Sequence, residues 1–126
     1  MKSKEIRVSK IGNRRGMIAE LYCEDVLIYD IASALEVAMT TSYETDSDRL
    51  ILNKEMIDEE FFDLDTGLAK ELCEKFENYS IKIAIYGDFS DYSEDSFHQF
   101  MLENNKGKDF FFAETREEAI SELEKA

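Results

Sequence analysis

Polar side chains follow three apolar segments of the sequence, at residues 49–53, 81–86 and 109–113. If these segments are parallel strands, their carboxyl ends meet at one edge of a sheet, where open α/β sheets bind ligands. A carboxylate at that edge can serve as a general base or as a ligand group, although Asp88 could instead cap the following loop. The sequence therefore predicts a ligand rim formed by Asn53, Lys54, Glu55, Gly87, Asp88, Glu114 and Thr115.

The segments that carry this rim have the patterns of β-strands. Residues 5–22 alternate apolar and polar side chains on either side of a turn at 12–16, which predicts a hairpin. The three segments ahead of the rim are short apolar runs, which are typical of strands buried on both faces. This pattern includes the aromatic run 110–112, which we interpret as a buried strand rather than a stacking surface.

Four helices are predicted between and after these strands. The first covers residues 30–44 and has an apolar face that includes Leu35 and Met39. Residues suited to capping mark where the helices begin, namely Asp30, Asp65, Ser93 and Thr115, the last in a capping box with Glu118.

This order of elements defines an α/β fold. Strand–helix units in succession favour parallel pairing, and the N-terminal hairpin adds an antiparallel pair, so we expect a mixed sheet of about five strands. The hairpin is followed by three parallel strands, with about four helices covering the sheet. The chain of 126 residues contains no proline or glycine-rich linker, so we expect a single domain over residues 1–126.

Acidic side chains dominate the charge of the chain, with 29 Asp and Glu against 15 Lys and Arg, a net charge of −14. Such a protein is repelled by nucleic-acid phosphates and by anionic membranes, so we expect neither as a partner. No apolar run is long enough to span a bilayer and the first residues lack a secretory signal, so the expected location is the cytoplasm. A neutral or basic protein, or a small molecule, is the expected partner.

Other common kinds of site have weaker support in the sequence. Cys23 and Cys73 lack zinc or redox spacing, and we interpret both as small buried hydrophobic residues. Nothing in the spacing pairs either cysteine with His98, the single histidine, as a nucleophile and its base. There is no glycine-rich phosphate loop, no calcium loop and no His/Cys cluster, so neither a cofactor nor a metal is expected.

The segment Asp-Leu-Asp-Thr-Gly-Leu-Ala at residues 63–69 lies between a predicted strand and a predicted helix. It resembles the signature of anti-sigma-factor-antagonist (STAS) domains, in which a partner kinase phosphorylates the hydroxyl residue just before the glycine. The resemblance implies a STAS-like fold and makes Thr66 the candidate phospho-acceptor. Its neighbours in the turn are Asp63, Asp65 and Gly67, and Asp65 stands where the STAS signature has a serine.

A phosphate on Thr66 would meet the unpaired amides and the partial positive charge of a helix N-terminus. It would also add about two negative charges to an exposed turn, enough to create or destroy a docking surface. The plainer alternative is a simple helix start, in which Thr66 and Gly67 serve only the backbone geometry.

Over nearly its whole length the chain is also similar to a bacterial family catalogued as domain of unknown function 4180. The stretches that carry this resemblance are residues 50–55, 61–69, 83–89 and 104–107. The resemblance supports the fold and implies no particular activity.

Three functions follow from these observations. The first is a non-enzymatic regulatory or protein-interaction module with a phosphorylation switch at Thr66. The second is a small-molecule-binding domain or a minor enzyme that uses the rim near Asn53, Lys54 and Asp88. The third is a module that forms a homodimer through exposed apolar helix faces.

Overall fold

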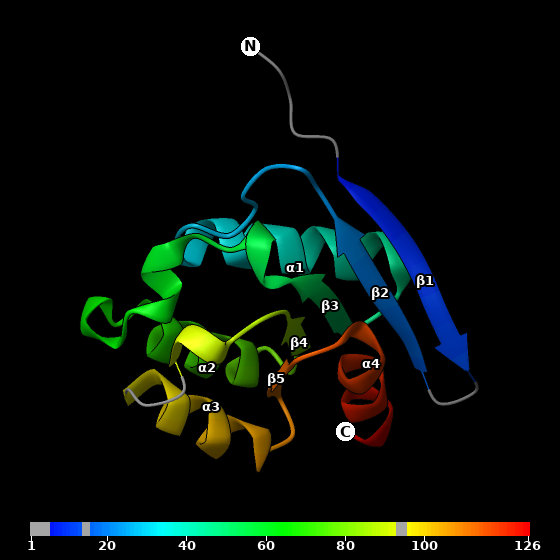
Figure 1. Cartoon of the computed structure of the whole chain (residues 1–126). Coiled ribbons are helices and arrows are strands. Elements are labelled where there is room, and N and C mark those ends of the chain that lie inside the picture. The colour runs from blue at the N-terminus through cyan, green and yellow to red at the C-terminus, as the bar shows by residue number, and fades with distance from the viewer. Residues whose placement is uncertain (1–5, 14–15, 93–95) are drawn as a thin grey trace.

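A computed structural model describes residues 6–13, 16–92 and 96–126. Five strands form one sheet in the order β1-β2-β3-β4-β5 (Figure 1). The strands are β1 (Arg7–Asn13), β2 (Gly16–Tyr22), β3 (Arg49–Asn53), β4 (Lys82–Tyr86) and β5 (Phe110–Ala113). β1 pairs antiparallel with β2, and all other neighbours are parallel. The predicted α/β class, with a hairpin followed by three parallel strands, is confirmed.

The helices in the described part of the chain are α1 (Ile31–Thr45), α2 (Leu68–Asn78), α3 (Ser96–Asn105) and α4 (Arg116–Lys125). Short 3-10 turns lie between them: η1 (Lys54–Met56), η2 (Glu59–Phe62), η3 (Leu64–Thr66) and η4 (Ser90–Tyr92). None of the helices in these ranges is long and apolar enough to cross a membrane.

The helices divide unequally between the two faces of the sheet. Strand order follows chain order from β2 to β5, so crossovers of the same hand place α1, α2 and α3 on one face. α4 follows the last strand without crossing over and packs on the other face, apart from the other three helices in Figure 1. The strands β3, β4 and β5 are consequently covered on both sides, which explains why the central residues of each strand are apolar.

Each face has its own core. The face under α1, α2 and α3 combines aliphatic side chains with a group of packed aromatic rings, in which Phe61 stacks on Phe110 at a centroid distance of 5.9 Å. The face under α4 is built from smaller side chains: Ile18, Ile51, Ala84, Phe111, Ala113, Ala119 and Leu123. Arg49 at the start of β3 donates to the carbonyl oxygens of Leu123 and Ala126 and so fixes the end of α4 to the sheet.

Two of the predicted helix caps are present. The Asp30 carboxylate accepts a hydrogen bond from the Ser33 amide at 2.7 Å, one residue before α1 begins. The Thr115 hydroxyl accepts from the Glu118 amide at 3.2 Å and caps α4. The predicted cap Ser93 lies outside the described residues.

Two other helix predictions were wrong. Asp65 does not cap α2, because the chain first makes the extra turn η3, and α2 begins at Leu68 with Gly67 as its N-cap at φ 76°. Met39 was expected to face the core but is 39% exposed. The buried side of α1 is made instead of small and hydroxyl side chains, which allow the helix to approach the sheet closely: Ser33, Ala34, Ala38, Thr41 and Thr45.

Candidate functional site

The carboxyl ends of β4 and β5 open a crevice between them. The chain leaves β4 at Gly87 toward α3 on one face, and leaves β5 at Glu114 toward α4 on the opposite face. When the connections of neighbouring parallel strands diverge in this way, a ligand-sized space is left outside the strand ends. The crevice has a volume of ≈ 790 Å³, which is within the usual range for small-molecule sites.

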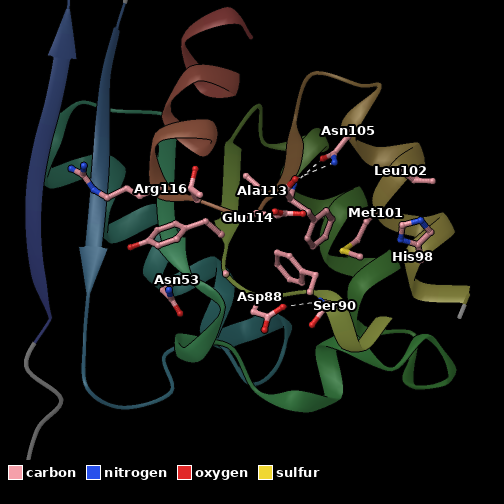
Figure 2. Close-up of a pocket in the computed structure, with 15 residues that line it drawn as sticks. Asn53, Asp88, Ser90, His98, Met101, Leu102, Asn105, Ala113, Glu114 and Arg116 are labelled. Atoms are coloured by element: carbon pink, nitrogen blue, oxygen red, sulfur yellow. Dashed lines mark hydrogen bonds between the residues drawn. The ribbon is translucent and has the colours of Figure 1, made fainter. Parts of the chain in front are cut away.

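The crevice is lined by apolar side chains and by a surrounding set of polar groups. The apolar residues are Tyr86, Phe89, Met101, Leu102, Phe112 and Ala113, with Gly87 beside them. The polar residues are Asn53, Asp88, Ser90, His98, Asn105, Glu114, Thr115 and Arg116. Figure 2 shows His98 and Leu102 on one side of the space, and Asn53 and Arg116 on the other.

Asp88 presents an ionised carboxylate at the crevice. Its Oδ1 accepts a hydrogen bond from the Ser90 amide at 2.9 Å, drawn in Figure 2. Hydrogen bonds from the Ser90 side chain and amide, followed by the positive charge of Lys54, hold the pKa of Asp88 below its ordinary value. Asp88 therefore caps the turn that begins η4 and at the same time leaves a negative charge on the exposed rim.

Gly87 allows Lys54 to pass close to the end of β4. A Cβ at Gly87, where φ is 153°, would lie 2.8 Å from Cγ of Lys54. The Lys54 stem crosses at this point, and its Nζ lies 5.6 Å from the ring centroid of Phe89 and 5.7 Å from that of Tyr92. At such distances the ammonium group is attracted by both rings. Phe89 lines the crevice, whereas Lys54 does not.

Arg116 and Glu20 close the end of the crevice that lies nearest to β2. Arg116 Nε and Nη2 donate to Glu20 Oε2 and Oε1 at 2.6 and 2.8 Å, a bidentate pair that fixes the start of α4 to β2. These hydrogen bonds hold the pKa of Arg116 above its ordinary value. Because Glu20 compensates the guanidinium charge, Arg116 adds little positive potential to the crevice.

Tyr86 is half-buried at the end of β4, beside this ion pair. Burial and then the negative charge of Glu20 raise the pKa of Tyr86, while Arg116 and a hydrogen bond from the Asn53 side chain oppose the rise. The hydroxyl is therefore protonated at neutral pH and can donate a hydrogen bond at the rim.

Thr66 lies on a separate surface turn. Thr66 is exposed, and its hydroxyl donates to the carbonyl oxygens of Glu60 and Asp63, at 2.8 and 2.9 Å. The same Oγ1 accepts from the Leu68 amide at 3.2 Å. One hydroxyl group thus connects η2, η3 and the start of α2.

The neighbours of Thr66 support this turn in different ways. The Asp63 carboxylate accepts from the Asp65 amide at 3.0 Å and holds η3, while Gly67 supplies the positive φ that leads into α2. Asp65 is exposed. The turn therefore opens a helix with its hydroxyl residue at the surface, as the interpretation of Thr66 requires.

The structure brings part of the predicted rim together. Asn53, Gly87, Asp88, Glu114 and Thr115 all line the crevice. Lys54 and Glu55 instead line a separate, more polar hollow of ≈ 480 Å³, together with Asp58, Glu59 and Asp91. The two residues depart from the rim because η1 begins immediately after β3, where the Asn53 side-chain oxygen accepts a hydrogen bond from the Glu55 amide.

The sequence reasoning missed the contribution of α3 to the crevice. His98, Met101, Leu102 and Asn105 recur at three-to-four spacing and form one stripe along this helix. That spacing was visible in the sequence, but a helix connecting two strands was expected to turn its apolar stripe to the core. Met101 does lie in the core, and the four residues also line the crevice.

The cysteines lie away from the crevice. Both are free; Cys23 is buried, and burial, followed by the charges of Glu74 and Glu77, raises the pKa of the Cys73 thiol to about 12. Within the described ranges, no group of three or more His, Cys, Asp or Glu side chains is arranged to hold a metal ion.

Comparison with known proteins gives one match. No curated protein and no solved structure matches the chain, so the STAS-like resemblance of residues 63–69 stays a prediction. A family model described as "Domain of unknown function (DUF4180)" matches residues 13–123. Because this match covers most of the sequence, the chain belongs to the DUF4180 family.

Proposed function

We propose that this domain binds a small organic molecule in the crevice at the ends of β4 and β5, and that the ligand has an apolar body and a positively charged group. The observation that carries the proposal is the crevice itself, ≈ 790 Å³ in volume at the divergence of two strand connections. Its position follows from the topology, so it is a property of the fold rather than of one side chain.

The apolar body of the ligand is inferred from the lining. Phe89, Met101 and Phe112 offer aromatic and thioether surface, which contacts an aliphatic or aromatic group without demanding a fixed hydrogen-bond geometry. Burial of about 100 Å² of apolar ligand surface here would contribute roughly 2.5 kcal/mol. This is enough to favour an amphipathic ligand over a fully polar one of the same charge.

The positive charge of the ligand is inferred from the rim. Asp88 and Glu114 place carboxylates at the opening, whereas the nearest guanidinium, that of Arg116, is already paired with Glu20. An anionic ligand would be repelled by these two carboxylates, whereas a cation would be attracted to them.

We propose binding without catalysis. Neither cysteine lines the crevice, and Asp88 has a depressed pKa, whereas a general base works best with a pKa near the working pH. These features support a role as a binding or sensing domain.

Thermal unfolding with two matched probes tests the proposal. Phenethylamine should raise the melting temperature of the protein by mass action, and phenylpropionate, which has a similar body and the opposite charge, should raise it less. Leu102→Trp should abolish the effect, because residue 102 is 44% exposed at the crevice and a larger side chain there fills the space. Met39→Trp, at a residue 39% exposed on α1, is the matched control and should leave it unchanged.

Charge variants separate the two parts of the proposal. Removing the rim charges with Asp88→Asn and Glu114→Gln should reduce the preference for the amine over the carboxylate, while Glu36→Gln on α1 should not. Equal shifts with both probes in the wild-type protein would contradict the inferred ligand charge. Shifts that persist in Leu102→Trp would place the binding elsewhere.

A second candidate function is a regulatory or protein-interaction role at Thr66. Its exposed position at the start of α2 supports access by a kinase, and phosphorylation would replace the O–H that donates to the Glu60 and Asp63 carbonyls. Modification would therefore loosen η2 while adding charge to the surface. Incubation with cell-extract kinases and ATP, followed by mass spectrometry, tests this role. Persistent absence of phosphate on Thr66 would count against it, as would partner binding that is unaffected by Thr66→Glu.

A further inference from the structure

The basic residues of this acidic chain are concentrated at its N-terminal end. Residues 1–16 contain six of the 15 Lys and Arg residues and one of the 29 Asp and Glu residues. The remaining stretch, residues 17–126, contains nine basic and 28 acidic residues. The first strand of the sheet therefore belongs to a positively charged segment, whereas the rest of the protein is strongly negative.

This segment includes an edge strand. β1 pairs with β2 on one side, and its main-chain groups on the outer side make no hydrogen bond to any described residue. Arg7 and Lys10 are exposed, whereas Val8 and Ile11 are half-buried against the two cores. Since side chains alternate along a strand, Arg7 and Lys10 lie on opposite faces of the sheet.

The other edge of the sheet is closed. The Asn105 carboxamide accepts from the Phe112 amide at 2.8 Å and donates to the Phe112 carbonyl at 3.1 Å. One side chain thus occupies both main-chain groups of Phe112, which an added strand would need on β5. Exposed edges invite pairing with another chain, and soluble proteins usually protect them. The contrast makes β1 the edge at which a strand can be added.

We propose that β1 accepts an extended, acidic segment of a partner protein as an additional strand of the sheet. Main-chain hydrogen bonds would supply part of the affinity and cross-strand side-chain pairs the specificity. Residues opposite Arg7 and Lys10 would be acidic and three positions apart, one on each face. Residues opposite Val8 and Ile11 would be apolar and would extend the two cores over the new strand.

The charges favour this partner over a second copy of the chain. Antiparallel pairing of β1 with its own copy would bring Arg7 and Lys10 of both chains close together, which is unfavourable. Pairing of β1 with β5 of another copy would require Asn105 to leave Phe112. Nucleic acid is disfavoured because Arg7 and Lys10 lie on opposite faces of the sheet and offer no continuous basic surface to a phosphate backbone.

Two synthetic peptides test the proposal against the full-length protein. The acidic probe is acetyl-Val-Glu-Thr-Val-Glu-Val-amide, whose antiparallel register places glutamates opposite Lys10 and Arg7. The control is the same peptide with lysine in place of both glutamates. Amide NMR spectra and hydrogen exchange report where each peptide binds. The acidic peptide should slow exchange in β1 and should bind roughly tenfold more tightly than the basic control at low salt.

Charge reversal gives the decisive comparison. The double variant Arg7→Glu and Lys10→Glu should prefer the basic peptide, because its glutamates would lie opposite the peptide's lysines. Both residues are exposed, so the substitutions should leave the two cores intact. Equal affinity of both peptides, failure of the preference to reverse, or protection outside β1 would overturn the proposal. Protection of β1 by self-association, or by a DNA duplex that competes with the acidic peptide, would also overturn it, in favour of a second copy or of nucleic acid.

Discussion

The contact between Gly87 and Lys54 gives a prediction that can be worked out from distances. In Gly87→Ala the new Cβ would lie 2.8 Å from Cγ and 3.0 Å from Cδ of Lys54. The backbone at Gly87 also has a φ of 153°, which side chains rarely tolerate. We therefore expect two separable costs, one from crowding of the lysine stem and one from the backbone.

Backbone strain of this kind costs about 1–3 kcal/mol. Crowding adds about 1 kcal/mol, toward the low end of overpacking effects because a lysine stem can shift. Gly87→Ala should thus lower the free energy of unfolding by about 2–4 kcal/mol. The Lys54→Ala variant keeps only the Cβ of residue 54, which would lie at an ordinary 3.4 Å from the new Cβ at residue 87. In that background, Gly87→Ala should therefore lower the free energy of unfolding by about 1 kcal/mol less.

Urea denaturation followed by circular dichroism measures all four proteins of this double-mutant cycle. Gly107→Ala is the matched control, because its Cβ would meet only the Asn104 carbonyl oxygen, at 3.4 Å. If Gly87→Ala is as stable as Gly107→Ala, the close approach of Lys54 to the end of β4 is refuted. If the cost is large but the same with and without the lysine stem, the strain is in the backbone alone.

Three further predictions concern single side chains. Thr66→Val should lower the free energy of unfolding by about 1–2 kcal/mol in urea titrations, because the hydroxyl joins η2, η3 and α2, whereas Thr66→Ser should restore it. Burial, followed by the charge of Glu74, raises the pKa of Cys73 from 9.0 to about 12, so stability present below pH 9.0 should be lost as the pH rises toward about 12. Cys73→Ala should flatten that loss, and identical urea midpoints for both proteins across the range would contradict it. Arg116→Lys should cost about 0.5–1 kcal/mol, since lysine cannot replace the bidentate contact with Glu20 and the arginine side chain is 40% exposed; a neutral effect would mean that the pair does not anchor α4.

The framework of this fold could be predicted because its elements obey local rules. The segment 49–53 has three apolar residues at its centre and forms β3 with the same bounds, and those three residues are buried. Asp30 and Thr115 cap helices because short polar side chains reach the free amides of the first turn. These signals depend on neighbouring residues only, so the sequence displays them directly.

The details that were not predicted depend on contacts distant in sequence. The N-cap of α2 is Gly67 rather than the predicted Asp65, because the Thr66 hydroxyl donates to the Glu60 carbonyl oxygen, six residues earlier. Met39 is exposed because α1 uses its small residues against the sheet. No periodicity contains such information.

The crevice could be predicted only in part. The rule for strand ends found Asn53 and Asp88, but placed Lys54 in the rim because nothing local indicates that its stem lies over Gly87. Arg116 was overlooked because its partner Glu20 is 96 residues away in the sequence. The sequence therefore indicates where such a site lies, but it does not identify all the residues that form it.

The most direct test of the proposed ligand site is an NMR measurement of phenethylamine bound to the wild-type protein. We expect nuclear Overhauser effects from the ligand ring to the Met101 methyl group and to the ring protons of Phe112, because both residues line the crevice. Contacts to any other surface, or none at saturating amine, would contradict the assignment of the crevice as the binding site.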